Sequence, residues 1–186
     1  MGNRLSKIST KTGDGGETGL GDGSRVSKHS LRVQALGDVD ELNSWIGLLR
    51  AELSSRDELQ PLLSQVQHDL FDLGGELAIP GYQLLNEQLL LDIEYALVEQ
   101  NEALPPLKDF ILPGGNRAAA HCHMARAVAR RSERTMVALM QEETLTDLGL
   151  RYLNRLSDLL FVLARVLARR HDGQEVLWQS RHQRSE

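Results

Sequence analysis

The sequence predicts an all-α protein, an up-and-down five-helix bundle that follows a glycine-rich N-terminal segment. From about residue 31 onward, apolar residues recur at intervals of three and four, which is the period of an amphipathic helix. No segment shows the convincing alternation of apolar and polar residues that marks a half-buried strand. Because the connections between the periodic segments are short, consecutive helices are expected to lie side by side and antiparallel.

Length and charge limit the class of protein. The chain has 186 residues, which favours one domain with a substantial core. We expect a loop segment over 1–30, the bundle over 31–172 and a polar tail over 173–186. The formal net charge is −5, whereas a nucleic-acid-binding domain is normally basic, so no nucleic-acid partner is expected.

Compartment is indicated by three further observations. The single cysteine, Cys122, cannot form an internal disulfide and fits a reducing compartment. No apolar run approaches the roughly 20 residues that span a bilayer, and residues 1–9 lack the apolar core of a signal peptide. These features predict a cytoplasmic protein without a membrane partner.

The elements follow in order along the chain. Residues 11–24 are rich in glycine, threonine and aspartate and are expected to be loop or turn. The first helix begins near residue 31. The second, which Ser55 or Asp57 can cap, ends at Pro80-Gly81. Their apolar stripes are Val33, Leu36, Val39, Leu42, Ile46, Leu49 and Leu53, then Leu59, Leu62, Leu63, Val66, Leu70, Leu73 and Leu77.

Three more helices complete the predicted bundle. The third carries an apolar stripe and ends before Pro105, and the short apolar segment 110–115 closes in a turn. The fourth runs from Arg117 to about Met140, and its alanines and lack of breakers favour a helix. Thr146 or Asp147 opens the fifth, which ends near Asp172-Gly173. The stripes of the third and fifth helices are Leu89, Leu90, Ile93 and Leu97, then Leu150, Leu153, Leu156, Leu160, Leu163 and Leu167.

An arginine ladder marks the fourth helix. Arg126, Arg130 and Arg134 are spaced i, i+4, i+8 and therefore stack along one helical face, where like charges repel. Arginine prefers bidentate partners such as phosphate and carboxylate, so one interpretation is an anion site. The alternative is a solvated helix face on which Glu133 and neighbouring acids are the partners.

The glycine-rich segment also admits two interpretations. Backbone N–H groups in such turns form anion-binding nests. Lys11 adds a cation, and Thr10, Thr12 and Thr18 add hydroxyls, which together suit a polyphosphate. The segment does not have the spacing of a Walker A loop, and it does not have the spacing of a Gly-x-Gly-x-x-Gly fingerprint. The alternative is a disordered polar N-terminus.

Single residues inside the helices are equally ambiguous. Asp40 either belongs to an acid-rich helix turn that the macrodipole favours, or orients a ladder arginine. Asn154, one turn before Asp158, is either an ordinary polar residue or a hydrogen-bonding partner of a nucleotide. Phe110 alone would be a core side chain. His121 and His123 point about 200° apart on a helix, so no shared metal site is expected there.

Four separated segments, in this order and spacing, together resemble one family, the PduO-type ATP:cob(I)alamin adenosyltransferases. The resemblance spans nearly the whole chain. The segments are Thr10-Lys11-Thr12-Gly13-Asp14 with Thr18, Gly37-Asp38-Val39-Asp40-Glu41-Leu42-Asn43, Phe110-Ile111-Leu112-Pro113-Gly114-Gly115 with His123-Met124-Ala125-Arg126 and Arg130-Arg131-Ser132-Glu133-Arg134, and Tyr152-Leu153-Asn154-Arg155-Leu156-Ser157-Asp158.

The resemblance implies a homotrimer of five-helix bundles that binds ATP and Mg²⁺ between subunits. It implies that Asp40 pairs with Arg126 across the subunit boundary, and that Phe110 blocks the lower face of the corrin. The Mg²⁺ ligands are not identified. Nucleotide contacts are implied for an N-terminal loop that becomes ordered on binding, with Thr10, Lys11, Thr12, Gly13, Thr18, Gly19 and nearby Lys28, and for Arg130, Arg131, Glu133, Arg134 and Asn154.

Three positions depart from the family pattern. Ser132 stands where Ala is common, and His121 stands where an aliphatic residue is common. Gly15 stands where many members have Lys, which removes a possible phosphate contact and leaves the loop more flexible.

The implied reaction is attack of cob(I)alamin on the 5′ carbon of ATP, which forms a cobalt–carbon bond and releases triphosphate. A reductase must supply Co(I). Two rival interpretations are a nucleotide-binding sensor on the same bundle and a structural bundle whose arginines make oligomer contacts. Phe110 and the Asp40–Arg126 pair argue against the sensor, and the glycine-rich N-terminus argues against the structural bundle.

Overall fold

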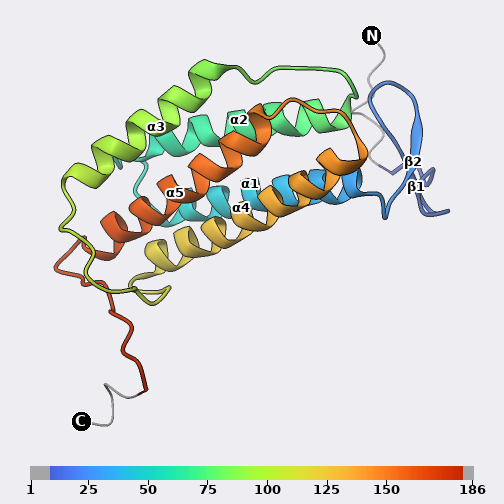
Figure 1. Ribbon diagram of the computed structural model, residues 1–186. Coiled ribbons are helices and arrows are strands. Elements are labelled where there is room, and N and C mark those ends of the chain that lie inside the picture. The colour runs from blue at the N-terminus through green and yellow to red at the C-terminus, as the bar shows by residue number, and fades with distance from the viewer. Residues whose placement is uncertain (1–8, 182–186) are drawn as a thin grey trace.

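The computed structural model describes residues 9–181, and it confirms the predicted all-α bundle (Figure 1). Residues 1–8, most of the segment in which a signal peptide was sought, lie outside the described part, as do residues 182–186 of the predicted polar tail. The helices are α1 (Leu31–Glu52), α2 (Gln60–Ala78), α3 (Glu87–Glu102), α4 (Arg117–Glu142) and α5 (Leu148–Ala168).

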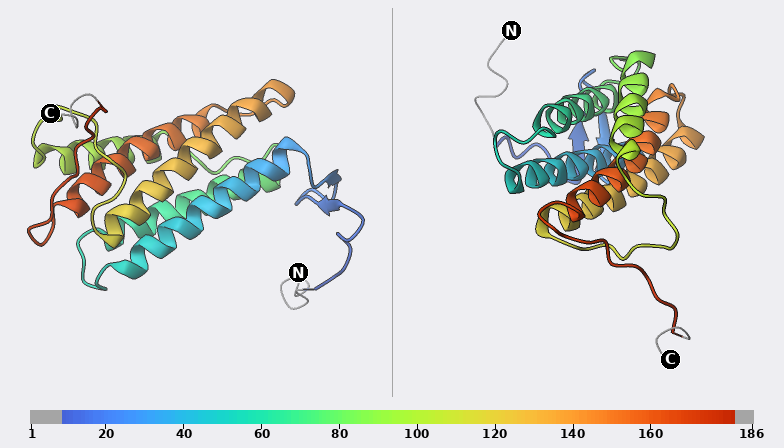
Figure 2. Two further views of the ribbon diagram at one scale, coloured as in Figure 1. Left: turned by 90° about the horizontal axis from the view of Figure 1, so that it is seen from below. Right: turned by 90° about the vertical axis from the view of Figure 1, so that its left-hand side faces the viewer.

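One buried apolar core is shared by the five helices. α4 packs between α5 and α1, α2 packs on α1, and α3 lies outside on α5 (Figures 1 and 2). Small residues allow these helices to approach closely. A Cβ on Gly149 of α5 would stand only 2.7 Å from Leu73 Cδ1 of α2, and Ala125 and Ala129 of α4 are fully buried.

The helices α1 and α4 run antiparallel and are joined by ion pairs at three heights. Charged side chains at matching positions make these contacts because the two helices lie alongside each other over their whole length. The pairs are Arg32 Nε–Glu143 Oε2 at 3.0 Å, Arg131 Nε–Asp38 Oδ1 at 3.0 Å and Arg117 Nη2–Glu52 Oε1 at 2.8 Å.

A buried polar contact fixes α2 against α5. The Tyr152 hydroxyl donates to Asp69 Oδ2 at 2.8 Å, and Gln65 Nε2 donates to Asp69 Oδ1 at 2.8 Å. Burial raises the pKa of Asp69 and raises the pKa of Tyr152. Because a buried polar group without its partner is costly, this contact favours a single alignment of the two helices.

The N-terminal segment corrects one prediction. Residues 11–24 were expected to be loop or turn, but β1 (Glu17–Gly19) and β2 (Arg25–Ser27) form an antiparallel hairpin. Its turn is closed by Asp22, which accepts from the Ser24 amide, and by Gly23 in the left-handed region at φ +92°. Strands of three residues are too short for an alternation of apolar and polar residues to be recognised, so the sequence did not predict the hairpin.

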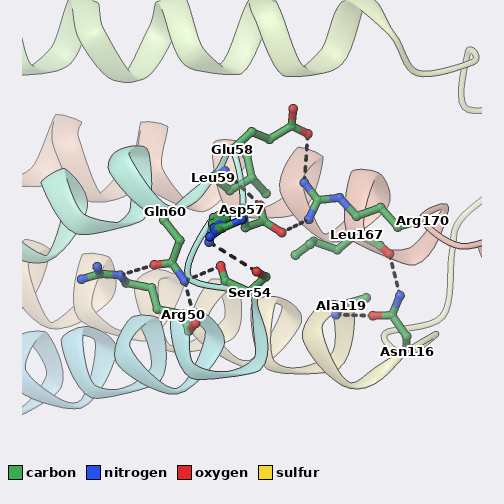
Figure 3. A network of polar contacts seen from close by, with 11 residues as sticks. Arg50, Ser54, Asp57, Glu58, Leu59, Gln60, Asn116, Ala119, Leu167 and Arg170 are labelled. Carbon is green, nitrogen blue, oxygen red and sulfur yellow. Dashed lines mark hydrogen bonds and ion pairs between the residues drawn. The ribbon is translucent and has the colours of Figure 1, made fainter.

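The end of the bundle away from this hairpin is held by polar contacts (Figure 3). Asn116 accepts from the Ala119 amide at the start of α4 and donates to the Leu167 carbonyl of α5 at 2.6 Å. Arg170 donates to Asp57 at 2.6 Å in the α1–α2 turn. Asp57 also accepts from the Leu59 amide before α2, but Leu59 is the N-cap residue and makes no side-chain cap bond, so the prediction that Ser55 or Asp57 caps α2 is wrong.

The fifth helix ends earlier than predicted. α5 ends at Ala168 and not near Asp172, because His171 and Asp172 adopt left-handed φ values of 56° and 61°. The chain then reverses, and the predicted polar tail pairs with the loop after α3. Within residues 9–181, no helix is both long and apolar enough to cross a membrane.

Candidate functional site

The ladder face of α4 opens into a groove between α3, α4 and α5. Arg126 and Arg130 both line it, so the structure brings two rungs of the predicted ladder to one site. Its volume is about 340 Å³, and both polar and apolar residues line it. Beside the two arginines, the polar residues are Asn101, Ser157 and Asp158, and the apolar residues are Leu97, Phe161 and Val162.

Arg126 is half-buried without a counter-ion. Its Nε is buried and has no hydrogen-bond partner among the described residues. Burial lowers the pKa of Arg126, and repulsion by the Arg130 guanidinium lowers it further. An unpaired, partly desolvated cation is costly, and an anion entering the groove would offset that cost. This observation favours the anion site over the solvated face.

His123 lies behind the groove. It is buried, its Nδ1 has no partner among the described residues, and its ring meets the edge of Phe161 at 6.4 Å between centroids. Burial lowers the pKa of His123, and the charge of Arg126 lowers it further. The His123 imidazole is therefore neutral. It packs against Phe161 and adds no positive charge beside Arg126.

The other predicted nucleotide contacts on this side are linked to one another. Asn154 Nδ2 donates to Glu133 Oε1 at 2.9 Å, which connects α5 to α4. Arg134 is exposed, and its Nη1 donates to the Arg130 carbonyl at 2.9 Å. Glu133, Arg134 and, from α5, Asn154 thus form a polar rim about two turns along the bundle from Arg126.

Arg131 points away from this rim, toward α1. Its guanidinium donates to Asp38 Oδ1 at 3.0 Å and pairs with Glu41. Asp38 also accepts from the Thr135 hydroxyl at 2.6 Å. Within one chain, then, Asp38 and Glu41 are the α1 acids that bind Arg131. The nucleotide contact predicted for Arg131 stays a prediction, and its existing pairs would compete with it.

Asp40 and Arg126 line different grooves of the chain. Asp40 is exposed and lies between α1 and α2, in a groove that also includes Leu36, Gly37 and the exposed ring of Phe71. The pair that the resemblance implied is therefore not formed within a single chain.

The N-terminal loop has the features expected of a phosphate-binding turn. Lys11 adopts a left-handed φ of 56° and Gly16 one of 86°. Lys28 Nζ lies over Gly13, where a Cβ would stand 2.9 Å from it, and the Lys28 amide donates to the Gly16 carbonyl. The ammonium of Lys28 thus lies beside the glycine-rich turn. The Thr10 and Thr12 hydroxyls hydrogen-bond at 2.9 Å, and Thr18 and Gly19 lie on β1.

Phe110 lies far from this loop. It belongs to the connection between α3 and α4 and is 78% exposed, whereas a core position would have been buried. Figure 1 shows that connection at one end of the bundle and the β1–β2 hairpin at the other. One chain therefore does not bring Phe110 and the N-terminal loop together.

Sequence reasoning missed part of the groove. Asn101, Phe161 and His123 were not assigned to a site, and Asp158 was named only as a neighbour of Asn154. Phe161 lies within the apolar stripe of α5, where an aromatic reads as core. The sequence could have drawn attention to Phe161 through the rarity of phenylalanine, since the chain has 3.

The arrangement can bind an anion against α4 and a flat apolar group beside Phe161 and Leu97. Ser157 is the one hydroxyl among the residues that line the groove, and it donates to the Asn154 carbonyl at 2.9 Å and not to a base that could activate it. No group of three or more His, Cys, Asp or Glu able to hold a metal occurs among residues 9–181. The buried Cys122 is a core residue, and burial raises its pKa.

The chain is similar to known proteins over most of its length. The family described as cobalamin adenosyltransferase matches residues 8–167. A cobalamin adenosyltransferase of Cupriavidus metallidurans is 59% identical over 179 residues, which cover 96% of this chain and 97% of that protein. A corrinoid adenosyltransferase of Bacillus subtilis is 48% identical and covers 87% of this chain and 86% of its own length.

Solved structures show the same fold. A variant PduO-type ATP:corrinoid adenosyltransferase from Lactobacillus reuteri, complexed with cobalamin and ATP, superposes with a TM-score of 0.89. It is 36% identical, and the match covers 94% of this chain and all of that one. A second variant from the same organism, complexed with ATP, gives a TM-score of 0.87 at 37% identity and covers 92% of this chain and all of that one.

Proposed function

The chain belongs to the cobalamin adenosyltransferase family, and from this premise we propose how its own residues carry out the reaction. The enzyme transfers the 5′-deoxyadenosyl group of ATP to the cobalt of cob(I)alamin or a related corrinoid. The Co(I) electron pair forms the cobalt–carbon bond while the C5′–O5′ bond breaks, and triphosphate leaves with the electron pair of the broken C5′–O5′ bond. The half-buried, unpaired Arg126 beside Arg130 is the observation that supports anionic partners at α4, and we propose that Arg126 meets a carboxylate of a second subunit while Arg130 meets the triphosphate.

The protein supplies binding and electrostatics, because the nucleophile belongs to the corrinoid substrate. Negative charge develops on the departing triphosphate, and Lys11, Arg130 and Arg134 would stabilise it together with the loop amides. Preorganised donors of this type are worth roughly 3–4 kcal/mol each. Holding cobalt in line with the 5′ carbon would supply much of the remaining acceleration.

Mg²⁺ would enter with the triphosphate. This ion usually takes phosphate oxygens together with one or two carboxylates and does not need an all-protein cage. Glu133 is the carboxylate at the rim between Arg130 and Arg134, and it already accepts a hydrogen bond from Asn154. We propose Glu133 as the protein ligand, and the ion would add positive charge beside the leaving group.

A complete site would require a second copy of the chain. Asp40 and Arg126 line separate grooves, and the N-terminal loop lies at the end opposite Phe110 (Figure 1). A homotrimer in which Asp40 of one subunit meets Arg126 of the next would remove the unpaired charge of Arg126. The same arrangement would let the N-terminal loop of one subunit become ordered over ATP on its neighbour.

Phe110 would act on the corrinoid before transfer. Cob(II)alamin is hard to reduce while its lower axial ligand is bound, and an apolar side chain in that position excludes both the ligand and water. The exposed Phe110 ring is available for this role. A separate reductase would supply the electron. A cytoplasmic location, where such reductants are found, stays a prediction.

An anaerobic assay tests the activity directly. Purified protein is mixed with ATP and chemically reduced cob(I)alamin, and formation of adenosylcobalamin is followed spectroscopically. Triphosphate should appear in equal amount. If ATP binds by calorimetry but no cobalt–carbon bond forms, the chain is a nucleotide sensor and the proposed function is wrong.

A further inference from the structure

Backbone hydrogen bonds, and not packing of its side chain, hold Phe110 in place. Its ring is 78% exposed, and it lies in the connection between α3 and α4, outside any helix. Two backbone hydrogen bonds hold this segment to the C-terminal tail. The Trp178 amide donates to the Phe110 carbonyl at 2.7 Å, and the Leu112 amide donates to the Val176 carbonyl at 2.8 Å.

The tail is itself anchored by a buried ion pair. Arg165 of α5 donates through Nε to Glu175 Oε1 at 2.5 Å and through Nη2 to Oε2 at 3.4 Å. The two side chains are only 5% and 8% exposed, and Arg169 Nη1 adds a third contact to Glu175 at 3.1 Å. A bidentate pair sheltered from water fixes geometry in a way that an exposed pair does not.

The same guanidinium also holds the other side of the Phe110 segment. Arg165 Nη2 donates to the Pro105 carbonyl at 2.9 Å, five residues before Phe110. One arginine therefore binds the chain that leads into the Phe110 segment and, through Glu175, the tail that pairs with this segment.

The chain reversal after α5 is what delivers Glu175 to Arg165. Gly173 allows this tight turn, because a Cβ there would stand 2.3 Å from the Ala168 carbonyl oxygen. The left-handed His171 and Asp172 precede it. The tail then runs back beside the last turns of α5, and Glu175 meets an arginine ten residues earlier in the sequence.

We propose that Arg165 and Glu175 are positioning residues for Phe110. By clamping Pro105 and the tail to α5, they hold the Phe110 backbone where its ring can occupy the lower face of the corrin. The proposal rests on the proposed function, since it assigns the clamp to the step in which Phe110 excludes the lower ligand of cob(II)alamin. Loosening the clamp should impair this step and spare the transfer from cob(I)alamin.

The experiment compares Glu175→Ala with the wild type in full-length protein. Turnover is measured once from chemically reduced cob(I)alamin and once from cob(II)alamin with a reductant. Electron paramagnetic resonance of cob(II)alamin with ATP gives the fraction that lacks its lower ligand. Hydrogen exchange at the Leu112 and Trp178 amides reports the pairing of the tail with the Phe110 segment.

We expect turnover of Glu175→Ala from cob(II)alamin to fall at least about tenfold, as for other residues that orient a functional group. Turnover from cob(I)alamin should stay within about twofold of wild type, because the transfer step is unchanged. The ligand-free fraction of cob(II)alamin should fall, and both amides should exchange faster. Phe110→Ala should lose turnover from cob(II)alamin as well, because it removes the ring that the clamp positions.

Two further variants control for folding. Arg170→Gln breaks the Arg170–Asp57 pair at the same end of the bundle, which touches neither Pro105 nor the tail, and should keep the wild-type spectrum. Should Glu175→Ala fail to fold because Arg165 is left buried and unpaired, the double variant Arg165→Met with Glu175→Met removes both charges. Apolar replacement of a buried pair is often neutral for stability, so this variant gives the same test.

Two results overturn the proposal. The first is wild-type turnover from cob(II)alamin and a wild-type spectrum in Glu175→Ala or the double variant. The second is unimpaired Phe110→Ala, because the clamp would then have nothing to position. If the wild-type chain itself does not adenosylate cob(I)alamin, the proposed function is wrong and this proposal is wrong with it. The cob(I)alamin assay therefore separates the two failures.

Discussion

Arg126 and Arg130 show how neighbouring arginines of one helix differ from Arg131. Among the described residues, Arg130 makes no side-chain hydrogen bond, and Arg126 has a buried Nε without a partner. Arg131, one position further, is held by Asp38 and Glu41. The first two retain free hydrogen-bonding capacity for a ligand, whereas the third joins α4 to α1. Side-chain direction around the helix accounts for this division.

The first prediction concerns Arg130. Arg130→Ala should weaken ATP binding about tenfold to a hundredfold, because a charged hydrogen bond contributes about 1.5–3 kcal/mol. The melting temperature should hardly change, since no protein contact is lost. Calorimetric titration with ATP measures this effect. Arg151→Ala, which removes an exposed α5 arginine paired with Glu87, is the matched control and should bind ATP as the wild type does.

The second prediction is a pH dependence of stability from His123. Burial and the charge of Arg126 lower its pKa from the ordinary 6.5 in the folded state. Below pH 6.5 the unfolded chain binds a proton that the folded chain refuses. The free energy of unfolding therefore falls as the pH drops, until the folded pKa is passed. Urea unfolding at several pH values between 7.5 and 4.5 should show a shallower fall for His123→Gln.

A histidine change elsewhere controls this measurement. His68→Gln, on α2, removes a histidine without touching Arg126 or Phe161. An equal change of slope in His68→Gln and His123→Gln would contradict the assignment to His123.

At the scale of elements, α4 serves two purposes with different faces. One face supplies the groove with Arg126 and Arg130, and another joins α1 through Arg131 and Arg117. Its start is tied to the end of α5 by Asn116, which satisfies orphan backbone groups of both helices. The groove therefore depends on contacts that set α4 against α5, well away from the groove itself.

The third prediction follows from that double contact. Asn116→Ala should destabilise the protein by about 2 kcal/mol, of which about one comes from the lost cap and about one from the lost bond to Leu167. For a chain of this size, the melting temperature should fall by roughly 4–8 °C. Asn86→Ala removes only a cap, at the start of α3. An equal loss in the two variants would show that the Leu167 contact contributes nothing.

At the scale of the whole molecule, the predicted site residues are distributed over a bundle that separates them. The N-terminal hairpin and the α3–α4 connection, which carries Phe110, lie at opposite ends (Figure 1). Asp40 lines a groove different from that of Arg126. Asp40 shares its groove with the largely exposed Phe71 ring. An apolar surface next to an acid is the kind of surface that a second subunit covers.

The fourth prediction tests the shared site by mixing subunits. Asp40→Ala and Arg126→Ala proteins should each be weakly active alone. Unfolded together and refolded at equal amounts, they should regain about one quarter of wild-type activity, because a ring of heterologous contacts pairs intact Asp40 with intact Arg126 at that frequency. Activity is measured from cob(I)alamin and ATP, with each variant refolded alone as the control.

No recovery on mixing would show that the two residues have separate roles and do not share one site. A charge-swapped double variant, Asp40→Arg with Arg126→Asp, provides an independent measurement. Additive losses in that double-mutant cycle would argue against direct pairing.

The five helices and their order were determined by the sequence alone, because amphipathic periodicity, caps and breakers are local properties of the chain. The predicted stripe on α5, for example, is buried throughout except at Leu150. The N-terminal hairpin escaped prediction because two three-residue strands carry no period. The spacing of Arg126, Arg130 and Arg134 is also a local property, so the sequence predicted that they share a helix face. It did not show which of them line the same groove.

Only the tertiary structure decided which distant residues meet. Arg131 meets Asp38 across 93 positions, Phe161 joins Arg126 in one groove, and Glu175 returns to Arg165 through the reversal at Gly173. These contacts depend on the angles at which helices pack and on turns of the chain, which no local pattern encodes. The burial that leaves Arg126 without a counter-ion has the same origin. Packing of α3, α4 and α5 is what places Arg126 and Arg130 in one groove.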